Sequence, residues 1–224
     1  TLFLMHDRSL GRTTTGSGAV AGTDWAEIAR MRLVDNDGTV TAFTPPTLDE
    51  ALVWARQTGA ILELDRKETT SFRNILEKVR EAGAENNVIL ISYTDEEALM
   101  IAELAPDVMM TAGIGNRDHE AAMIEAGLDP ERLIAWTGTR RPSPGKWRGL
   151  ASKDIESAFG TLGRAGERLD DQYWADGDPS EYEDLVEAGL VMLATDTPYR
   201  LMELEGTIGG AVDRANQACF IKAE

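Results

Sequence analysis

A histidine near the start of the sequence is the first side chain with a clear potential for chemistry. His6 follows a short apolar segment, residues 1–5, and precedes a polar loop. A histidine at the end of a strand can face a site, and because imidazole titrates near neutrality it can transfer protons there. The alternative is a histidine that only anchors a surface loop. On this residue alone both interpretations stay open.

A run of alternating charges is the second candidate. Glu63, Asp65 and Lys67 lie two residues apart on a predicted strand, which places their side chains on the same side of it. Burying three charges on an apolar strand costs free energy unless they pair or bind a ligand. One interpretation is an Asp–Lys ion pair that caps the strand. The other is a site in which a carboxylate binds a hard cation and the ammonium group binds an anion.

Composition excludes several classes of function. The chain has 22 basic and 39 acidic residues, a formal charge of −17, and no basic run with which to bind nucleic acid. Its apolar runs are far shorter than the roughly 20 residues that cross a bilayer, so we expect no stable membrane insertion. A hydrophobic content of 42% is ordinary for a globular protein. Cys219 is the one cysteine and indicates no compartment, and the oligomeric state stays open.

A repeated order of helix, glycine and short apolar strand organises the sequence. Helices are predicted at 48–57, 71–82, 96–104, 119–126, 147–153 and 181–188. Strands are predicted at 60–64, 88–93, 108–112, 133–136, 155–161 and 190–194, after an opening strand at 1–5. This alternation is typical of a parallel sheet that is buried on both faces.

Two α/β architectures fit six such strands, an open doubly wound sheet and most of a TIM (β/α)₈-type barrel. No Gly-x-Gly-x-x-Gly follows any strand, which argues against dinucleotide binding. Polar residues follow nearly every strand, where barrel enzymes assemble their sites. These residues are Asp65, Lys67, Ser92, Tyr93, Thr111, Thr137, Thr161, Thr195 and Asp196. The sequence therefore favours the barrel.

Four motifs in order resemble those of a known family. They are MHDRSLGRTTTGSG at 5–18, PTLDEAL at 46–52, LELDRK at 62–67 and ATDTP at 194–198. With these motifs, the chain resembles the glycerophosphodiester phosphodiesterase (GDPD) family over most of its length. The resemblance implies a (β/α)₈ barrel that hydrolyses a small glycerophosphodiester to sn-glycerol 3-phosphate and an alcohol. It also implies a divalent metal cofactor, Ca²⁺ or Mg²⁺.

The same resemblance implies roles for individual residues. His6, in the His-Asp motif, would be the catalytic residue that protonates the leaving alkoxide. Asp65, in the acid-x-Lys motif, would bind the metal, with Glu63 as the alternative ligand. Lys67 would bind a phosphodiester oxygen.

Two further residues are candidates for substrate binding. Arg12, in the loop after His6, would either approach the phosphate or anchor the loop. Trp136 ends a predicted strand, where it would form an apolar wall for the glycerol or the leaving group. A core position is the alternative for this tryptophan.

The sequence also departs from the family pattern. It contains no His-Arg-Gly, no Glu-x-Asp precedes the opening strand, and Asp65 stands where the family has Glu. We therefore expect the first two barrel strands to be absent from this chain, which alone would be inactive. Residues 1–205 are predicted as the incomplete barrel and 206–224 as a C-terminal extension. A related phospholipase-type phosphodiesterase and a barrel that binds a phosphodiester without turnover are the alternative functions.

Overall fold

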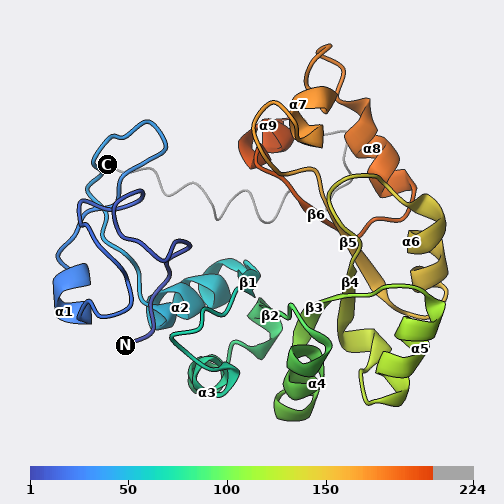
Figure 1. The fold of residues 1–224 in the computed structure, drawn as a ribbon, viewed down its shortest axis with the longest axis horizontal. Coiled ribbons are helices and arrows are strands. Elements are labelled where there is room, and N and C mark those ends of the chain that lie inside the picture. The colour runs from blue at the N-terminus through green and yellow to red at the C-terminus, as the bar shows by residue number, and fades with distance from the viewer. Residues whose placement is uncertain (204–224) are drawn as a thin grey trace. The chain divides into compact units, whose positions relative to one another are not determined.

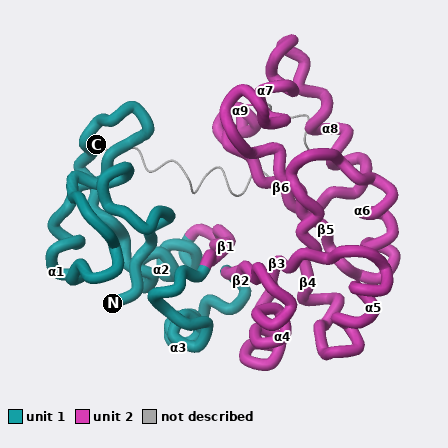
Figure 2. The backbone as a smooth tube through the Cα atoms, in the orientation of Figure 1, with its two compact units in different colours: residues 1–57, 66–87 teal, residues 58–65, 88–224 magenta. Residues whose placement is uncertain are grey.

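The computed structural model describes residues 1–203, which form two compact units (Figure 2). Unit 1 comprises residues 1–57 and 66–87, and unit 2 comprises residues 58–65 and the chain from residue 88 onward. The single domain expected over 1–205 stays a prediction. The expected C-terminal extension, 206–224, lies outside the described residues.

Helices and strands alternate along most of the chain (Figure 1). The strands are β1 (Leu62–Leu64), β2 (Val88–Ile91), β3 (Met109–Gly113), β4 (Leu133–Trp136), β5 (Glu156–Gly160) and β6 (Met192–Ala194). The helices are α1 (Trp25–Ile28), α2 (Leu48–Thr58), α3 (Phe72–Ala82), α4 (Asp95–Leu104), α5 (Arg117–Glu125), α6 (Pro144–Ala151), α7 (Leu169–Tyr173), α8 (Ser180–Glu187) and α9 (Pro198–Glu203). The sequence pattern missed α7 and α9, which are only five and six residues long.

The six strands of unit 2 form one parallel sheet in the order β1-β2-β3-β4-β5-β6. This confirms the predicted α/β class, and the sheet curls as a part of a barrel does (Figure 1). Because every pairing is parallel, the carboxyl ends of all six strands lie at the same edge. Within residues 1–203, β1 and β6 each have one edge that pairs with no further strand.

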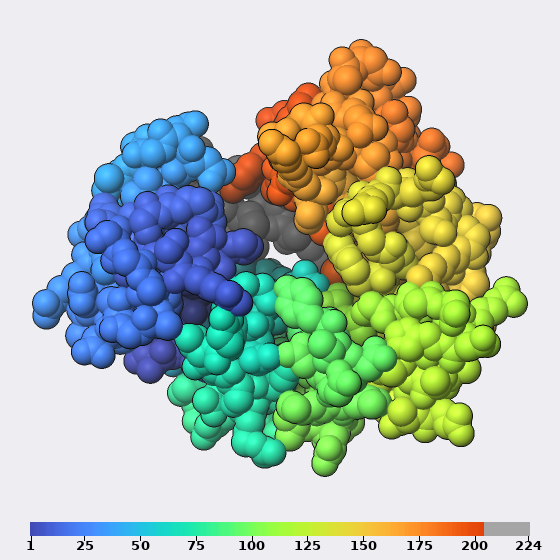
Figure 3. All heavy atoms as spheres, in the orientation of Figure 1, coloured from blue at the N-terminus to red at the C-terminus, as the bar shows by residue number. Residues whose placement is uncertain are grey.

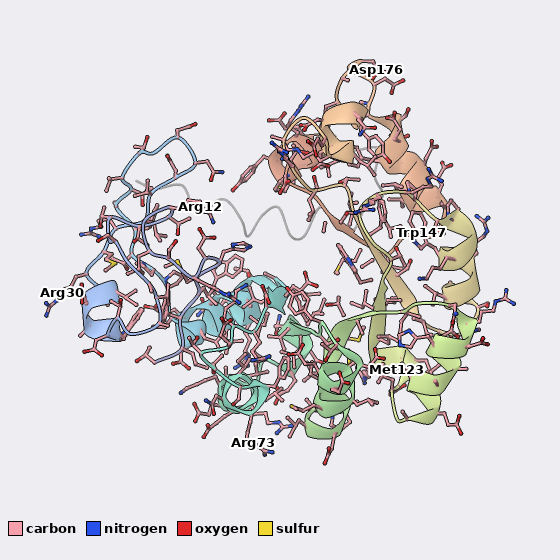
Figure 4. All side chains as sticks on the ribbon, in the orientation of Figure 1. Arg12, Arg30, Arg73, Met123, Trp147 and Asp176 are labelled. Atoms are coloured by element: carbon pink, nitrogen blue, oxygen red, sulfur yellow. The ribbon has the colours of Figure 1, made fainter. Side chains whose placement is uncertain are left out.

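The two faces of the sheet are built differently. On the outer face Phe159 of β5 packs on Trp147 of α6, with ring centroids 5.7 Å apart and both side chains fully buried. Figure 4 labels Trp147 on α6. The atoms of α4, α5 and α6 form a continuous rim in Figure 3, coloured green to yellow. The inner face carries a smaller apolar cluster centred on Ile89, Ile134 and Ala158.

Several of the helices, α3 and α4 among them, begin at side-chain caps. Ser71 accepts a hydrogen bond from the Asn74 N–H at the start of α3, and Thr94 accepts one from the Glu97 N–H at the start of α4. Gly83 ends α3 in the left-handed conformation, at φ 60°, which favours glycine. In the part of the chain that the structure describes, no helix is long and apolar enough to cross a membrane.

Unit 1 has its own small apolar core. The structure of this unit contradicts one prediction, the opening strand at 1–5. The segment 1–5 is not a strand, because it makes only a single antiparallel bridge, between Phe3 and Thr47. Phe3 and Met5 pack instead beside Leu10, Ile28 and Met31. Part of the apolar segment that suggested a strand thus packs on this local core.

A buried carboxylate joins the last strand to the helices around it. Asp170 of α7 is fully buried and accepts hydrogen bonds from the hydroxyls of Tyr182, at 2.6 Å, and Thr195, at 2.9 Å. Its second oxygen accepts from the Asp196 N–H at 2.8 Å. Burial, followed by the bond to Asp170, raises the pKa of Tyr182 to about 12. The network fixes the segment that follows β6.

We predict that Tyr182→Phe lowers the free energy of unfolding by about 1–3 kcal/mol, because it removes a donor from a buried carboxylate. Urea unfolding at pH 7 measures this, and Tyr199→Phe, at a side chain 74% exposed, is the matched control. Since the folded state raises this pKa, the contribution of Tyr182 is complete below pH 10 and is lost as pH rises through about 12. In Tyr182→Phe, the part of the decrease in the free energy of unfolding between pH 10 and 12 that comes from Tyr182 should be absent. An unchanged midpoint at pH 7 would contradict the role of the network.

Candidate active site

His6 lies in a loop of unit 1 and bonds to the next residue. Its Nδ1 is 2.8 Å from Oδ1 of Asp7, and its side chain is 81% exposed. A carboxylate only accepts hydrogen bonds, so Nδ1 carries the proton in this contact. The other ring nitrogen, Nε2, is therefore the atom available for proton transfer.

Arg12 holds Asp7 from the other side. Its Nε is 2.5 Å from Oδ2 and its Nη2 is 2.7 Å from Oδ1, a two-point contact between guanidinium and carboxylate. The bond to Arg12, and then the bond to His6, hold the pKa of the Asp7 carboxyl well below its usual range. Asp7 therefore stays charged and orients the imidazole.

The loop keeps its shape through buried contacts around Leu10. The Leu10 carbonyl accepts from the Thr14 hydroxyl at 2.7 Å, and the Leu10 N–H donates to Gly18 at 3.0 Å. A Cβ at Gly16 would lie 2.4 Å from Sδ of Met31, so a side chain at this position would displace the end of the Met31 side chain. The Gly/Thr-rich sequence after His6 thus builds a closed loop rather than a helix.

A second ion pair ties this loop to the segment that follows β1. Arg8 lies 2.9 Å from Glu68, directly after Lys67, and all three residues belong to unit 1. His6, Arg8 and Arg12 line an open depression on this unit. The predicted catalytic histidine and two of the predicted substrate-binding residues, Arg12 and Lys67, are thus in one unit.

The predicted metal ligands belong to unit 2, on the inner side of β1. Glu63 accepts a hydrogen bond from the Thr111 hydroxyl of β3 at 3.2 Å. Burial raises the pKa of Glu63, the Thr111 bond lowers it, and the negative charge of Asp65 raises it again. Two carboxylates therefore lie close enough to repel each other.

Tyr93, after β2, lies near Asp65 at the carboxyl edge of the sheet. Burial first, and then the negative charge of Asp65, raise the pKa of this tyrosine. Its ring is 70% exposed at the carboxyl edge of the sheet. The sequence placed Tyr93 at a strand end but gave it no role, because a contact between neighbouring strands has no signature in either strand alone.

Trp136 ends β4 on the inner face. It is partly buried against the cluster of Ile89, Ile134 and Ala158, and its ring covers Gly160 of β5. A Cβ at Gly160 would lie 3.0 Å from Cη2 of this ring. The tryptophan is thus part of the inner apolar face at the edge where the strands end.

The glycine-containing loop after β5, residues 160–163, binds a carboxylate of the chain itself, that of Asp196. Oδ2 of Asp196 accepts from the Gly163 N–H at 3.0 Å and from Arg168 at 2.9 Å. Arg168 also contacts Asp171 at 3.0 Å. In the structure these donors hold the segment after β6 and face no open phosphate site.

His119 of α5 makes hydrogen bonds through both of its ring nitrogens. Its Nδ1 accepts from the Gly115 N–H at 2.9 Å, and its Nε2 lies 3.1 Å from both carboxylate oxygens of Asp95. It thereby joins the start of α5 to the start of α4. The pairing connects residues 24 positions apart, which explains why the helix pattern did not indicate it.

A comparison with protein-family models tests the family resemblance of these motifs. Residues 1–129 match the model of the glycerophosphoryl diester phosphodiesterase family. The chain belongs to this family. The family resemblance predicted from the sequence motifs is therefore confirmed. The matched range includes His6, Glu63, Asp65 and Lys67.

Solved structures agree with the fold of this family. A glycerophosphoryl diester phosphodiesterase from Parabacteroides distasonis is 24% identical, with a TM-score of 0.73 over 90% of this chain and 69% of that chain. A phosphodiesterase from Oleispira antarctica, solved in complex with the product sn-glycerol-3-phosphate, is 16% identical, with a TM-score of 0.64 over 90% of this chain and 78% of its own.

A curated relative is matched over a shorter stretch. An uncharacterized protein of Bacillus subtilis (strain 168), YqiK, is 25% identical over 113 residues. The match covers 48% of this chain and 46% of that protein. The chain thus spans less than half of the length of this relative.

We predict opposite shifts in the pKa of Glu63 from two substitutions beside it. Asp65→Asn removes a negative neighbour and should lower this pKa, whereas Thr111→Val removes a hydrogen bond to the carboxylate and should raise it. NMR titration of the Glu63 side chain measures both. Glu125→Gln, on an exposed turn of α5, should leave it unchanged. Shifts in the same direction would show that the two contacts do not set this pKa.

Proposed function

We propose that the protein hydrolyses glycerophosphodiesters to sn-glycerol 3-phosphate and an alcohol. The observation that carries the proposal is the His6–Asp7–Arg12 arrangement, which lies within the residues matched by the family model. The Oleispira antarctica phosphodiesterase, which shares the fold, was solved with the same product. An imidazole with one nitrogen held by a carboxylate and the other exposed is suited to proton transfer.

In this proposal His6 acts on the leaving alcohol. Over the hydrolysis, an oxygen of water becomes bonded to phosphorus as the bond between phosphorus and the alcohol oxygen breaks. The electron pair of the broken bond stays on the alcohol oxygen, and Nε2 of protonated His6 donates a proton to it. Asp7 keeps the Nδ1 proton and the ring orientation throughout. Arg12 keeps Asp7 charged and fixed, so the ring does not have to reorient during the step.

Cationic side chains near His6 support binding of an anion despite the net charge of −17. Arg8 and Arg12 line the depression beside the histidine, and Lys67 precedes Glu68, the partner of Arg8. Lys67 and Arg12 are proposed to bind phosphodiester oxygens. Arg12 can do so because its contact with Asp7 uses Nε and Nη2 and leaves other N–H groups. Trp136 is proposed as an apolar wall for the substrate.

Glu63 and Asp65 fit part of the site for a divalent cation, Ca²⁺ or Mg²⁺. Carboxylate oxygens are the ligands that these hard cations prefer, and a cation would relieve the repulsion that contributes to the raised pKa of Glu63. Two carboxylates do not complete a coordination shell, and residues 1–203 contain no group of three or more His, Cys, Asp or Glu placed to hold a metal. When bound, the cation would neutralise charge on the phosphoryl oxygens.

The proposal includes two further barrel strands that carry the remaining carboxylates and a second histidine. The sheet supports it, because β1 and β6 each leave one edge that no strand of the described chain pairs. An exposed strand edge is a liability for aggregation, and closure of a barrel removes it.

We predict that His6→Gln in the complete protein lowers kcat by about 10²–10⁴-fold, because it removes the proton donor to the leaving group. KM should change little, since the cations that bind the phosphate remain. Release of glycerol 3-phosphate from glycerophosphocholine measures both constants. His119→Gln is the control and should retain most of the activity. An active His6→Gln variant would refute the assignment.

Removal of divalent metal should abolish this activity. We expect chelation with EDTA to stop release of glycerol 3-phosphate, and added Ca²⁺ or Mg²⁺ to restore it. Asp65→Asn should require a higher concentration of the cation for half-maximal activity, because the ligand loses its charge. Full activity in EDTA would exclude the metal from the reaction and leave the role of His6 standing.

A further inference from the structure

A groove between α5 and α6 is formed by residues outside the candidate active site. Its walls are the start of α5, the loop before that helix and one face of α6, and its volume is about 580 Å³. The two helices are neighbours on the outer side of the sheet (Figure 1). All the lining residues belong to unit 2. The volume is in the range of about 300–1,000 Å³ that is usual for small-molecule sites.

Lys146 of α6 lies in this groove, and its ammonium group is held by two backbone carbonyls. Nζ donates to the Ile114 carbonyl at 2.5 Å and to the Gly115 carbonyl at 3.1 Å. These carbonyls orient the ammonium group without neutralising it, and they use two of its three N–H donors. Burial lowers the pKa of Lys146, whereas the charge of Glu120 raises it, and the lowering is the larger effect. The positive charge of Lys146 is therefore only partly compensated.

The charges that line the groove do not balance. Glu120 of α5 is only 6% exposed, and its carboxylate accepts from Nζ of Lys153, which follows α6. Lys146 is a second ammonium group beside this carboxylate, and Arg117 adds a guanidinium group at the start of α5. Among the described residues that line the groove, three side chains are thus positive and one is negative. An anion with two negative charges would neutralise the groove, although the whole chain has a charge of −17.

Two glycines on the same face of α6 keep the groove open. Gly145 and Gly149 are one helical turn apart, and both line the groove. A Cβ at either position would meet no atom within 4 Å, so packing in the described chain does not require glycine there. Glycine inside a helix is destabilising relative to alanine. Room for a bound molecule explains the two glycines where packing does not.

We propose that this groove binds a small phosphate monoester, with the phosphate at Lys146 and Lys153 and the carbon part over Gly145 and Gly149. A phosphate monoester carries nearly two negative charges at neutral pH, both on one group. This matches two ammonium groups that lie beside the same carboxylate, that of Glu120. A groove of about 580 Å³ is much larger than inorganic phosphate, which favours an ester. The inference is independent of the proposed function, because it uses none of the residues assigned to the reaction.

The test follows the backbone amide signals of the full 224-residue chain by ¹H–¹⁵N NMR during titration with sn-glycerol 3-phosphate. This chain contains every lining residue of the groove, so binding there does not need further barrel strands. We expect saturable shifts at Gly115, Asn116 and Gly145. Inorganic phosphate should bind more weakly, because it lacks the carbon part. Glycerol should cause no shifts, because it lacks the charge.

Two variants test the two ends of the groove. Lys146→Met removes an ammonium group that bonds to the phosphate and should raise Kd about 10–100-fold. Gly149→Leu fills the groove but keeps every charge, so it should abolish the shifts at Gly115 and Asn116. It should also raise the Tm, because leucine favours the helix and a Cβ meets no atom there. If Gly149 served packing instead, the Tm would fall.

Two control variants separate binding from general effects of charge and stability. Arg148→Gln removes a positive charge from α6 at an exposed position outside the groove, so it should leave Kd unchanged. Gly149→Ala adds a single methyl group, so it should raise the Tm and still bind the monoester. Circular dichroism confirms that each variant is folded before titration.

Saturable shifts at the groove that Gly149→Leu abolishes and Arg148→Gln retains support the inference. It is wrong if sn-glycerol 3-phosphate shifts no signal of the groove, if the shifts are confined to the His6 loop, or if Gly149→Leu binds with the same Kd. Equal affinity for inorganic phosphate would overturn the assignment to an ester. None of these results bears on the proposed function, which release of glycerol 3-phosphate from a diester measures separately.

Discussion

The parallel hydrogen-bonded ladder of unit 2 is the constraint on which the rest of the structure depends. It brings the carboxyl ends of six strands to one edge, so residues that are far apart in the sequence become neighbours there. Glu63 and Thr111 are 48 positions apart, yet the ladder places their side chains within hydrogen-bond distance. The helices outside the sheet contribute by burying its other face, as Trp147 does on Phe159.

Charge is distributed unevenly in this acidic chain. The His6 loop carries Arg8 and Arg12, which pair with Glu68 and Asp7, whereas the end of β1 places the carboxylates of Glu63 and Asp65 close together. The first arrangement suits an anion and a proton donor, and the second suits a cation. These are the two kinds of site that a metal-assisted phosphodiesterase needs, and the net charge alone indicated neither.

Much of the fold could be predicted from the sequence, because each βα unit carries its own local signals. A cap such as Ser71, an amphipathic repeat and a final residue such as Gly83 define a helix without reference to the rest of the chain. The same reasoning failed for segment 1–5, where a local core imitates the pattern of a strand. It also missed α7 and α9, which are too short to show a helical period.

The candidate site was predictable only in part. Family motifs pointed to His6 and Asp65, since these residues lie in short runs of recognisable sequence. Thr111 and Arg8 were given no role, because each contacts a residue that only the folded backbone brings close. The hydrogen bonds of His119 are of the same kind, since they reach the loop before α5 and the start of α4.

The order of the strands also bears on how the sheet forms. Each strand of the described sheet pairs only with its neighbours in the sequence, and short helical segments form each crossover, with both α7 and α8 between β5 and β6. The loops to be closed are therefore short, and their entropic cost is small compared with that of joining distant parts of a chain. Such a sheet can grow one unit at a time, with each new strand stabilised by the one before it, as the units of a repeat protein are.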